Sequence, residues 1–151
     1  MSEPDPYRLH HSLGFALSVV ARQQETRLDN LLKSIGLTRI NWCILLAIGN
    51  ENLGKPSEIA GFVGIDRAAT SRALQHLEKD GLLVRKTGLR DRRTRRTSLT
   101  HKGRALVQKG TPFARQNAAI LAARLTGGEH EELVRLLEKL LHNDEPPLGH
   151  L

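Results

Sequence analysis

Cysteine, aromatic side chains and long apolar runs are scarce in this chain of 151 residues, and each scarcity excludes a class of protein. The single cysteine, Cys43, excludes an intrachain disulfide and a cysteine-based zinc finger. Aromatic residues make up 3% of the chain, so its core must consist mostly of Leu, Ile, Val and Ala. No run of about 18 apolar residues occurs, and the amino terminus lacks the apolar segment of a signal peptide. We therefore expect a soluble cytoplasmic protein with no membrane partner.

One short segment carries nearly all of the net positive charge. The formal net charge of the chain is +7. The segment from Arg85 to Arg96 holds seven cations and one anion, Asp91, which gives +6 and leaves +1 for all other residues. Charge concentrated in this way indicates a binding surface, and a row of guanidinium groups suits a phosphate backbone.

The residues before this segment have the pattern of two short helices joined by a tight turn. Pro56 suits the first turn of a helix over residues 56–63, which Gly64 ends. Asp66 is a good N-cap for a second helix, which ends at residues 79–81. Small side chains at Ala60 and Gly64 allow the two helices to approach closely, so the pattern predicts a helix-turn-helix.

The second of these helices is amphipathic. Its apolar stripe consists of Ala69, Ala73, Leu74 and Leu77. The opposite face carries Arg67, Ala68, Ser71, Arg72 and Gln75. This face is either an ordinary solvated surface or the surface that reads a ligand.

Strand-forming residues follow at 82–87 and 94–99, with a loop at 88–93. We expect a β-hairpin whose tip is strongly basic.

Helices are expected on both sides of this unit. Residues 8–35 carry apolar side chains at helical spacing until Gly36. A helix of that length spans roughly 40 Å, which is more than a small core can cover, so part of it should meet another chain. Thr38 is expected to cap a helix over residues 39–48 that is apolar nearly all round and belongs in the core.

The carboxyl-terminal part of the chain also has helical spacing. Thr100 should cap a helix that reaches about Leu125, with a kink or short break at residues 110–112 because of Pro112. Thr126 and Glu129 fit a capping box for a last helix. The apolar face of that helix is formed by Leu133, Leu136, Leu137, Leu140 and Leu141.

Several short motifs occur together in the middle of the chain. The two short helices and the strand after them contain Ile59-Ala60, Gly64, Thr70-Ser71-Arg72, Leu77-Glu78 and Gly81-Leu82-Leu83. Asp91 and Arg93 are followed by Leu99-Thr100 and Gly103, in the order Asp-x-Arg, strand, Leu-Thr-x-x-Gly. In these features the chain resembles the MarR family of winged helix-turn-helix transcriptional regulators.

The resemblance implies a mainly α fold with a small β-wing. Residues 1–151 would form one subunit, and residues 38–100 its winged helix-turn-helix. Residues 8–36 and 101–143 would be dimerisation helices on either side of it. The implied function is a homodimeric regulator, a repressor of transcription, that binds an inverted-repeat operator in double-stranded DNA and is released by a small-molecule effector.

The resemblance also assigns roles to individual residues. Arg67, Ala68, Ser71, Arg72 and Gln75 would face the major groove, where arginine pairs with guanine and glutamine with adenine. Arg93 would enter the minor groove, with Asp91 holding it in place. Phosphate contacts are expected from Arg90, Arg92, Arg95 and Arg96, and from Lys55 and Ser57 at the start of the preceding helix. The alternative for the loop is nonspecific phosphate contact alone, and the effector site remains unknown.

Other functions have little support in the sequence. No Gly-rich phosphate loop, acidic pair or activated nucleophile indicates an enzyme, and no cofactor is implied. The seven histidines lack metal-ligand spacing. Cys43 falls in the apolar helix, with no cation expected beside it, so an inert core position is favoured over a redox sensor. The alternative function is a nonspecific architectural or RNA-binding winged-helix protein, which would share the basic hairpin.

Overall fold

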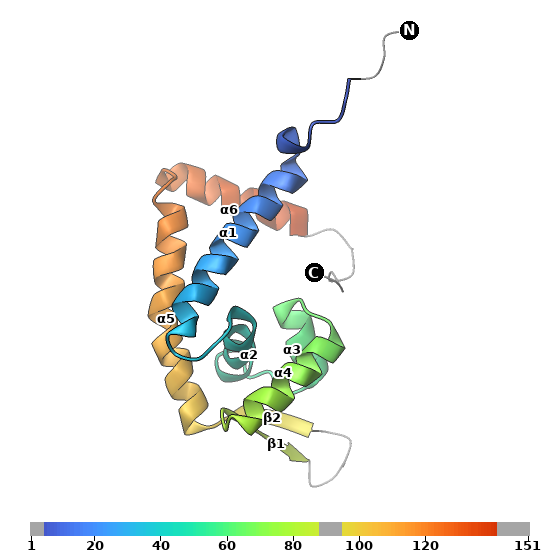
Figure 1. Cartoon of the computed structure of the whole chain (residues 1–151), viewed down its shortest axis with the longest axis vertical. Helices are drawn as coiled ribbons and strands as arrows, with labels where there is room; N and C mark the ends of the chain where they lie inside the picture. The colour runs from blue at the N-terminus through green and yellow to red at the C-terminus, as the bar shows by residue number, and fades with distance from the viewer. Residues whose placement is uncertain (1–4, 88–94, 142–151) are drawn as a thin grey trace.

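The computed structural model describes residues 5–87 and 95–141 of the chain (Figure 1). Within these ranges a short 3₁₀ turn, η1 (Leu9–His11), precedes six α-helices and a two-stranded sheet. The helices and strands are α1 (Leu13–Lys33), α2 (Arg39–Gly49), α3 (Pro56–Val63), α4 (Arg67–Lys79), β1 (Leu83–Thr87), β2 (Arg95–Leu99), α5 (His101–Ala122) and α6 (Gly127–Leu141). The mainly helical fold with a small β-ribbon is confirmed. None of the described helices is long and apolar enough to cross a membrane.

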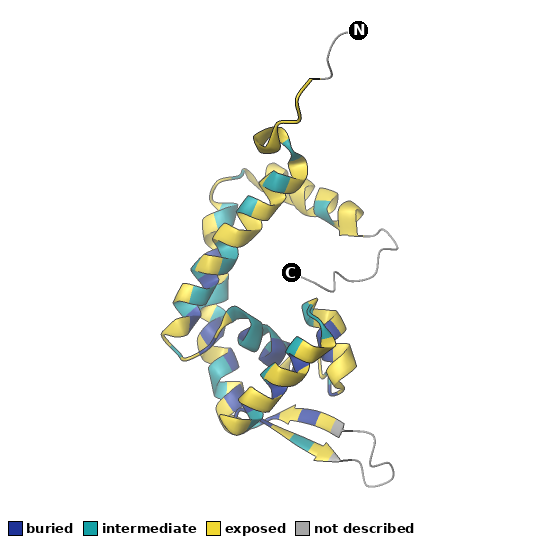
Figure 2. Ribbon diagram, turned by 45° about the vertical axis from the view of Figure 1, so that its right-hand side comes forward, coloured by how far each residue is buried: buried dark blue, intermediate teal, exposed yellow. Residues whose placement is uncertain are grey.

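The core is built around α2. Trp42, Ile44, Leu45, Ala47 and Ile48 are all buried, as expected for a helix that is apolar nearly all round. Side chains from every neighbouring element pack on them, including Leu28, Leu32, Ile59, Leu74, Leu77, Leu83, Leu99 and Val107. Figure 2 shows the buried residues gathered where α2, α3 and α4 meet the first half of α5, whereas the far end of the molecule is largely exposed.

The first helix is shorter than the sequence predicted. It begins at Leu13 because Ser12 has an extended backbone and its hydroxyl accepts a hydrogen bond from the Phe15 N–H at 3.4 Å, which makes Ser12 an N-cap. The His10 ring meets the Phe15 ring edge-on at a centroid distance of 4.9 Å. A start at residue 8 was therefore wrong, and 21 helical residues span roughly 32 Å rather than 40 Å.

A kink or a short break was expected at residues 110–112, and the break is absent, because α5 is continuous through Pro112 and ends at Ala122. Gly110 lies directly against the Trp42 indole, so close that a Cβ there would be 2.3 Å from Nε1. The Thr111 hydroxyl donates to the Val107 carbonyl at 2.8 Å. The helix therefore continues through Pro112 where it packs on α2, although the proline removes one backbone donor.

A buried polar cluster joins α1 to α5, which lie side by side (Figure 1). Asn117 is only 4% exposed. Its Nδ2 donates to the backbone carbonyl and to Oε1 of Gln24, both at 3.1 Å, and its Oδ1 accepts from Arg27 Nη1 at 3.0 Å. The amide thus satisfies its polar atoms by linking the two helices, and it fixes how they are placed along each other.

Candidate nucleic-acid interface

The helix-turn-helix is held by caps at both sides of its turn. Gly64 follows α3 with φ +76°, and its N–H donates to the Ala60 carbonyl at 2.9 Å. Asp66 caps α4 by accepting a hydrogen bond from the Ala69 N–H at 2.7 Å. Both caps were predicted, and they set the angle at which α4 leaves the core.

α4 exposes the predicted face. Its buried side chains are Thr70, Leu74 and Leu77. The exposed residues include Arg67, Ala68, Ser71, Arg72 and Gln75, the whole predicted set. Thr70 was not singled out for a structural role, yet its hydroxyl donates to the Asp66 carbonyl at 2.9 Å and is fully buried. The helix therefore presents two arginines and a glutamine outward from a fixed base.

The start of α3 carries an internal ion pair. Lys55 is exposed, and its Nζ lies 3.4 Å from Glu58 Oε1. The Lys55 N–H also donates to Glu58 Oε2 at 3.4 Å. Ser57 is exposed beside them. A phosphate at this helix start would compete with the Glu58 carboxylate, an effect that the sequence interpretation of Lys55 and Ser57 did not consider.

The β-ribbon packs one of its faces on the protein. β1 and β2 are antiparallel, with Leu83 opposite Leu99 and Arg85 opposite Thr97. Leu83, Leu99 and Thr97 are buried. The Thr97 N–H donates to the Gly54 carbonyl at 2.9 Å, so the loop before α3 continues the hydrogen bonding of the sheet by one rung.

The outward face of the ribbon carries two opposed cations. Lys86 lies directly opposite Arg96, and both are exposed. Side chains opposite each other have Cβ atoms about 5 Å apart, and like charges there are destabilising unless an anion lies between them. Gly54 makes room for the Arg96 side chain, because a Cβ at Gly54 would lie 2.6 Å from Arg96 Cγ. Lys86 was absent from the predicted contacts, although the alternation of the strand could have placed it with Arg96.

Arg85 departs from the uniform row of cations inferred from the sequence. It lies on the inward face, and its side chain is 15% exposed. Its Nε donates to Glu78 Oε2 of α4 at 2.8 Å, and its Nη2 donates to the same oxygen. This charge is therefore already matched within the subunit.

The tip of the hairpin falls outside the described residues. Arg90, Asp91, Arg92 and Arg93 lie there, and so does the side chain of Arg95, whose backbone pairs with Thr87 in the ribbon. Their assignments remain predictions.

Comparison with known proteins shows which family the chain is similar to. A sequence model described as MarR family matches residues 35–94, which extend from α2 into the hairpin. Over these residues the chain is similar to the MarR family, whose members are DNA-binding transcriptional regulators, and its fold is the winged-helix fold of that family. The whole fold is similar to BpsR of Bordetella bronchiseptica, whose DNA binding is regulated by 6-hydroxynicotinic acid; the TM-score is 0.84 at 25% identity, over 93% of this chain and 100% of that one.

Two further members of the family are similar over most of their length. The transcriptional repressor CouR, solved on a 23-mer DNA duplex, matches with a TM-score of 0.81 and 28% identity, over 93% of this chain and 100% of that one. A MarR-family protein of Mycobacterium tuberculosis in complex with p-aminosalicylic acid matches with a TM-score of 0.70 and 28% identity, over 85% and 98%.

Cys43 is not as isolated as the sequence suggested. Arg39, one turn earlier in α2, lies close enough to lower the pKa of the Cys43 thiol, so the expectation of no nearby cation was wrong. Burial nevertheless raises the pKa of the Cys43 thiol, and Arg39 offsets only part of that effect. Arg39 also pairs with Glu25 of α1 at 3.2 Å. No group of three or more His, Cys, Asp or Glu side chains within the described ranges is placed to hold a metal ion.

The end of the molecule far from the ribbon carries exposed apolar side chains. In α6 no residue is buried, and four of the five predicted face leucines, Leu133, Leu136, Leu140 and Leu141, are exposed. Leu9, Leu13, Leu17 and Val20 add further exposed apolar surface at the start of the chain. The capping box of α6 is confirmed, because the Thr126 N–H donates to Glu129 Oε2 at 2.8 Å and the Glu129 N–H to Thr126 Oγ1 at 3.3 Å.

Proposed function

We propose that this chain is a MarR-family regulator, a homodimeric repressor that binds an inverted-repeat operator and releases it when a small effector binds. The observation that carries the proposal is the pairing of two surfaces at one end of the molecule. The outward face of α4, with Arg67, Arg72 and Gln75, lies beside a ribbon whose outer face opposes Lys86 to Arg96 (Figure 1).

The two surfaces have different tasks in this proposal. Arg67, Arg72 and Gln75 read base edges in the major groove, where arginine suits guanine and glutamine suits adenine. Lys86 and Arg96 bind phosphate, which relieves their mutual repulsion and positions the protein without reading sequence. Arg93, at the hairpin tip, enters the minor groove, where a narrow A·T-rich segment attracts a cation.

The exposed leucines support dimerisation. The apolar face of α6 has nothing covering it within the described chain, and a two-fold dimer buries such a face against the same face of its copy. Two α4 helices related by that axis would enter successive major grooves about 34 Å apart. An inverted repeat is the DNA symmetry that matches this arrangement.

The proposed effector is an aromatic compound that carries a phenolic or an anionic group. The relatives BpsR and the M. tuberculosis protein were studied with 6-hydroxynicotinic acid and p-aminosalicylic acid, and CouR was also solved with p-coumaroyl-CoA. Such a ligand releases DNA only if it binds more tightly to the subunit spacing that no longer fits one turn of the duplex.

The first test is selection of bound sequences from random duplex DNA by the purified protein at about 150 mM salt, which suppresses purely electrostatic binding. Enrichment of an inverted repeat with half-sites about one helical turn apart supports the proposal. No enrichment, with binding lost as salt rises, contradicts it and favours the nonspecific architectural or RNA-binding alternative.

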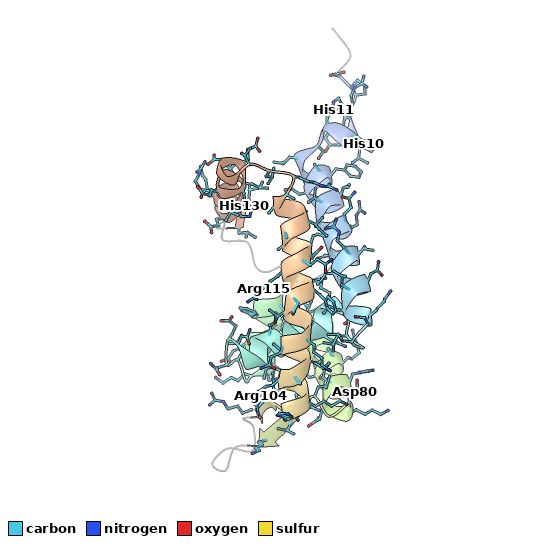
Figure 3. All side chains as sticks on the ribbon, turned by 90° about the vertical axis from the view of Figure 1, so that its left-hand side faces the viewer. His10, His11, Asp80, Arg104, Arg115 and His130 are labelled. Carbon is cyan, nitrogen blue, oxygen red and sulfur yellow. The ribbon has the colours of Figure 1, made fainter. Side chains whose placement is uncertain are left out.

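Variants then assign the contacts. Arg72→Ala should cost about 1–3 kcal/mol of binding free energy and relax base preference at one position in each half-site. Arg93→Ala should weaken operator binding while the dimer persists. Arg115→Ala is the matched control, because Arg115 is an exposed arginine on the outer face of α5, away from the ribbon (Figure 3). If all three variants bind operator DNA with equal affinity, α4 and the hairpin tip do not belong to the DNA interface.

The dimer is tested separately by sedimentation. Leu136→Glu places a charge in the exposed leucine face and should convert dimer to monomer at micromolar concentration. Glu131→Gln, on the opposite side of α6, should leave the dimer unchanged. A wild-type protein that sediments as a monomer would overturn the assignment of this face.

A further inference from the structure

The pair formed by Arg85 and Glu78 joins the ribbon to the helix proposed to read DNA. Arg85 is the third residue of β1, and Glu78 is in the last turn of α4. The guanidinium group directs both Nε and Nη2 at one carboxylate oxygen, with Nε at 2.8 Å. Two donors on one acceptor restrict rotation of the arginine more than a single hydrogen bond does.

The connection between the two elements explains why such a pair has a role. α4 ends in a tight turn in which the Leu82 N–H donates to the Leu77 carbonyl at 2.9 Å and the Gly81 N–H to the Glu78 carbonyl at 3.0 Å. Gly81 takes φ +72° in this turn. Leu83, buried in the core, fixes the base of the ribbon, and Arg85 lies two residues further along the same face.

We propose that Arg85 and Glu78 are positioning residues that set the angle between α4 and the ribbon, and that Arg85 does not bind phosphate. This inference rests on the proposed DNA-binding function. It divides the cations of the hairpin into two groups. Lys86 and Arg96 face outward to the nucleic acid, whereas Arg85 faces inward and orients the strand that carries Lys86.

The proposal predicts an effect opposite in sign to simple electrostatics. Glu78→Gln removes a negative charge close to a polyanion, so charge alone would tighten DNA binding. If Glu78 holds Arg85 and thereby the ribbon, the same substitution must weaken binding instead. Asp80→Asn is the matched control, because it makes the same charge change two residues away, where Asp80 pairs with His76 at 3.0 Å rather than with the ribbon.

The experiment measures binding of full-length protein to the inverted-repeat duplex obtained by selection and to a random-sequence duplex of equal length. Glu78→Gln should weaken operator binding by about threefold or more, whereas Asp80→Asn should bind as tightly as wild type or more tightly. The charge exchange, Glu78→Arg with Arg85→Glu, should restore most of the lost affinity. In the Glu78→Gln background, Arg85→Gln should weaken binding little further, since a phosphate contact made by Arg85 itself would be lost in either background.

Hydrogen exchange in the free protein provides a readout that needs no DNA. The amide hydrogens between β1 and β2 should exchange faster in Glu78→Gln than in wild type or Asp80→Asn, because the ribbon opens more often. Unchanged exchange, or operator binding by Glu78→Gln as tight as that by Asp80→Asn, overturns the positioning role. If wild type selects no sequence, the proposed function fails, and the exchange measurement still decides whether the pair orders the ribbon.

Discussion

Gly103 is the position at which the structure makes the sharpest stability prediction. It lies in the first turn of α5, where its N–H donates to the Thr100 hydroxyl at 3.1 Å. A Cβ added at Gly103 would lie 2.0 Å from the carbonyl oxygen of Leu82. That oxygen also accepts the Thr100 N–H at 3.1 Å. Gly103→Ala therefore forces apart the start of α5 and the segment that follows α4.

The expected cost can be built from its parts. The contact must open by about 1 Å, since Cβ contacts below 3.0 Å essentially do not occur. Overpacking of this kind costs about 1–3 kcal/mol, and weakening the Thr100 hydrogen bond adds about 1 kcal/mol. Alanine recovers up to about 1 kcal/mol of helix propensity. A net loss of about 2 kcal/mol lowers Tm by about 4–8 °C for a chain of this length.

The matched control is a second helical glycine with open space around it. Gly61 is exposed in α3, and a Cβ there would have no heavy atom within 4 Å. Gly61→Ala should therefore raise stability by up to about 1 kcal/mol. Thermal unfolding of both variants at one protein concentration, with urea titration as a second measure, tests the argument. If the two substitutions shift Tm in the same direction, the close approach of Leu82 to α5 is not what requires glycine.

Three further predictions concern the buried amide, the thiol and the capping box. Asn117→Ala should lower the free energy of unfolding in urea by about 1–3 kcal/mol, because Arg27 loses its hydrogen-bond partner. Substitution of the exposed neighbour, Gln116→Ala, should change that free energy by less than about 0.5 kcal/mol. Equal effects of the two substitutions would contradict the role of Asn117 in linking α1 to α5. Because burial raises the pKa of Cys43, alkylation near neutral pH should be slower in the folded protein than in urea, and equal rates would show an accessible thiolate. The backbone hydrogen bond from Thr126 lowers the pKa of Glu129. The ionised Glu129 carboxylate therefore stabilises α6 fully above the ordinary pKa range of glutamate, and this stabilisation is lost as the pH falls through the lowered pKa. Glu129→Gln should therefore reduce the loss of helix at acid pH that circular dichroism measures.

Local signals in the sequence were sufficient wherever a structural feature depends on neighbouring residues. The turn at Gly64, the cap at Asp66 and the capping box at Thr126 are each decided within a few positions, and each is confirmed. The outward face of α4 followed from helical spacing because its buried stripe is apolar. The predicted start of α1 was wrong for a local reason too, since Ser12 is a good N-cap within a stretch that otherwise has helical spacing.

Contacts between distant parts of the chain explain the remaining differences. Pro112 does not break α5, and the Trp42 indole that packs against this turn at Gly110 comes from a different helix. Asn117 donates a hydrogen bond to Gln24, which lies 93 positions earlier in the sequence. The strand register decides whether Arg85 faces the solvent or α4, and a count of charges along the sequence gives no information on that register. The net charge of the basic segment was thus predictable from the sequence, but the division of its cations between an outward and an inward face required the structure.

The opposed pair of Lys86 and Arg96 gives ionic strength two opposite roles in this protein. Added salt screens the repulsion between the two side chains and so steadies the free ribbon. The same salt reduces the release of counterions that drives binding to a nucleic acid. In dilute buffer, which favours complex formation, the ribbon of the free protein will therefore be least stable when no polyanion is present. A small oxyanion such as sulfate will stabilise the ribbon of the free protein but will also compete with the nucleic acid.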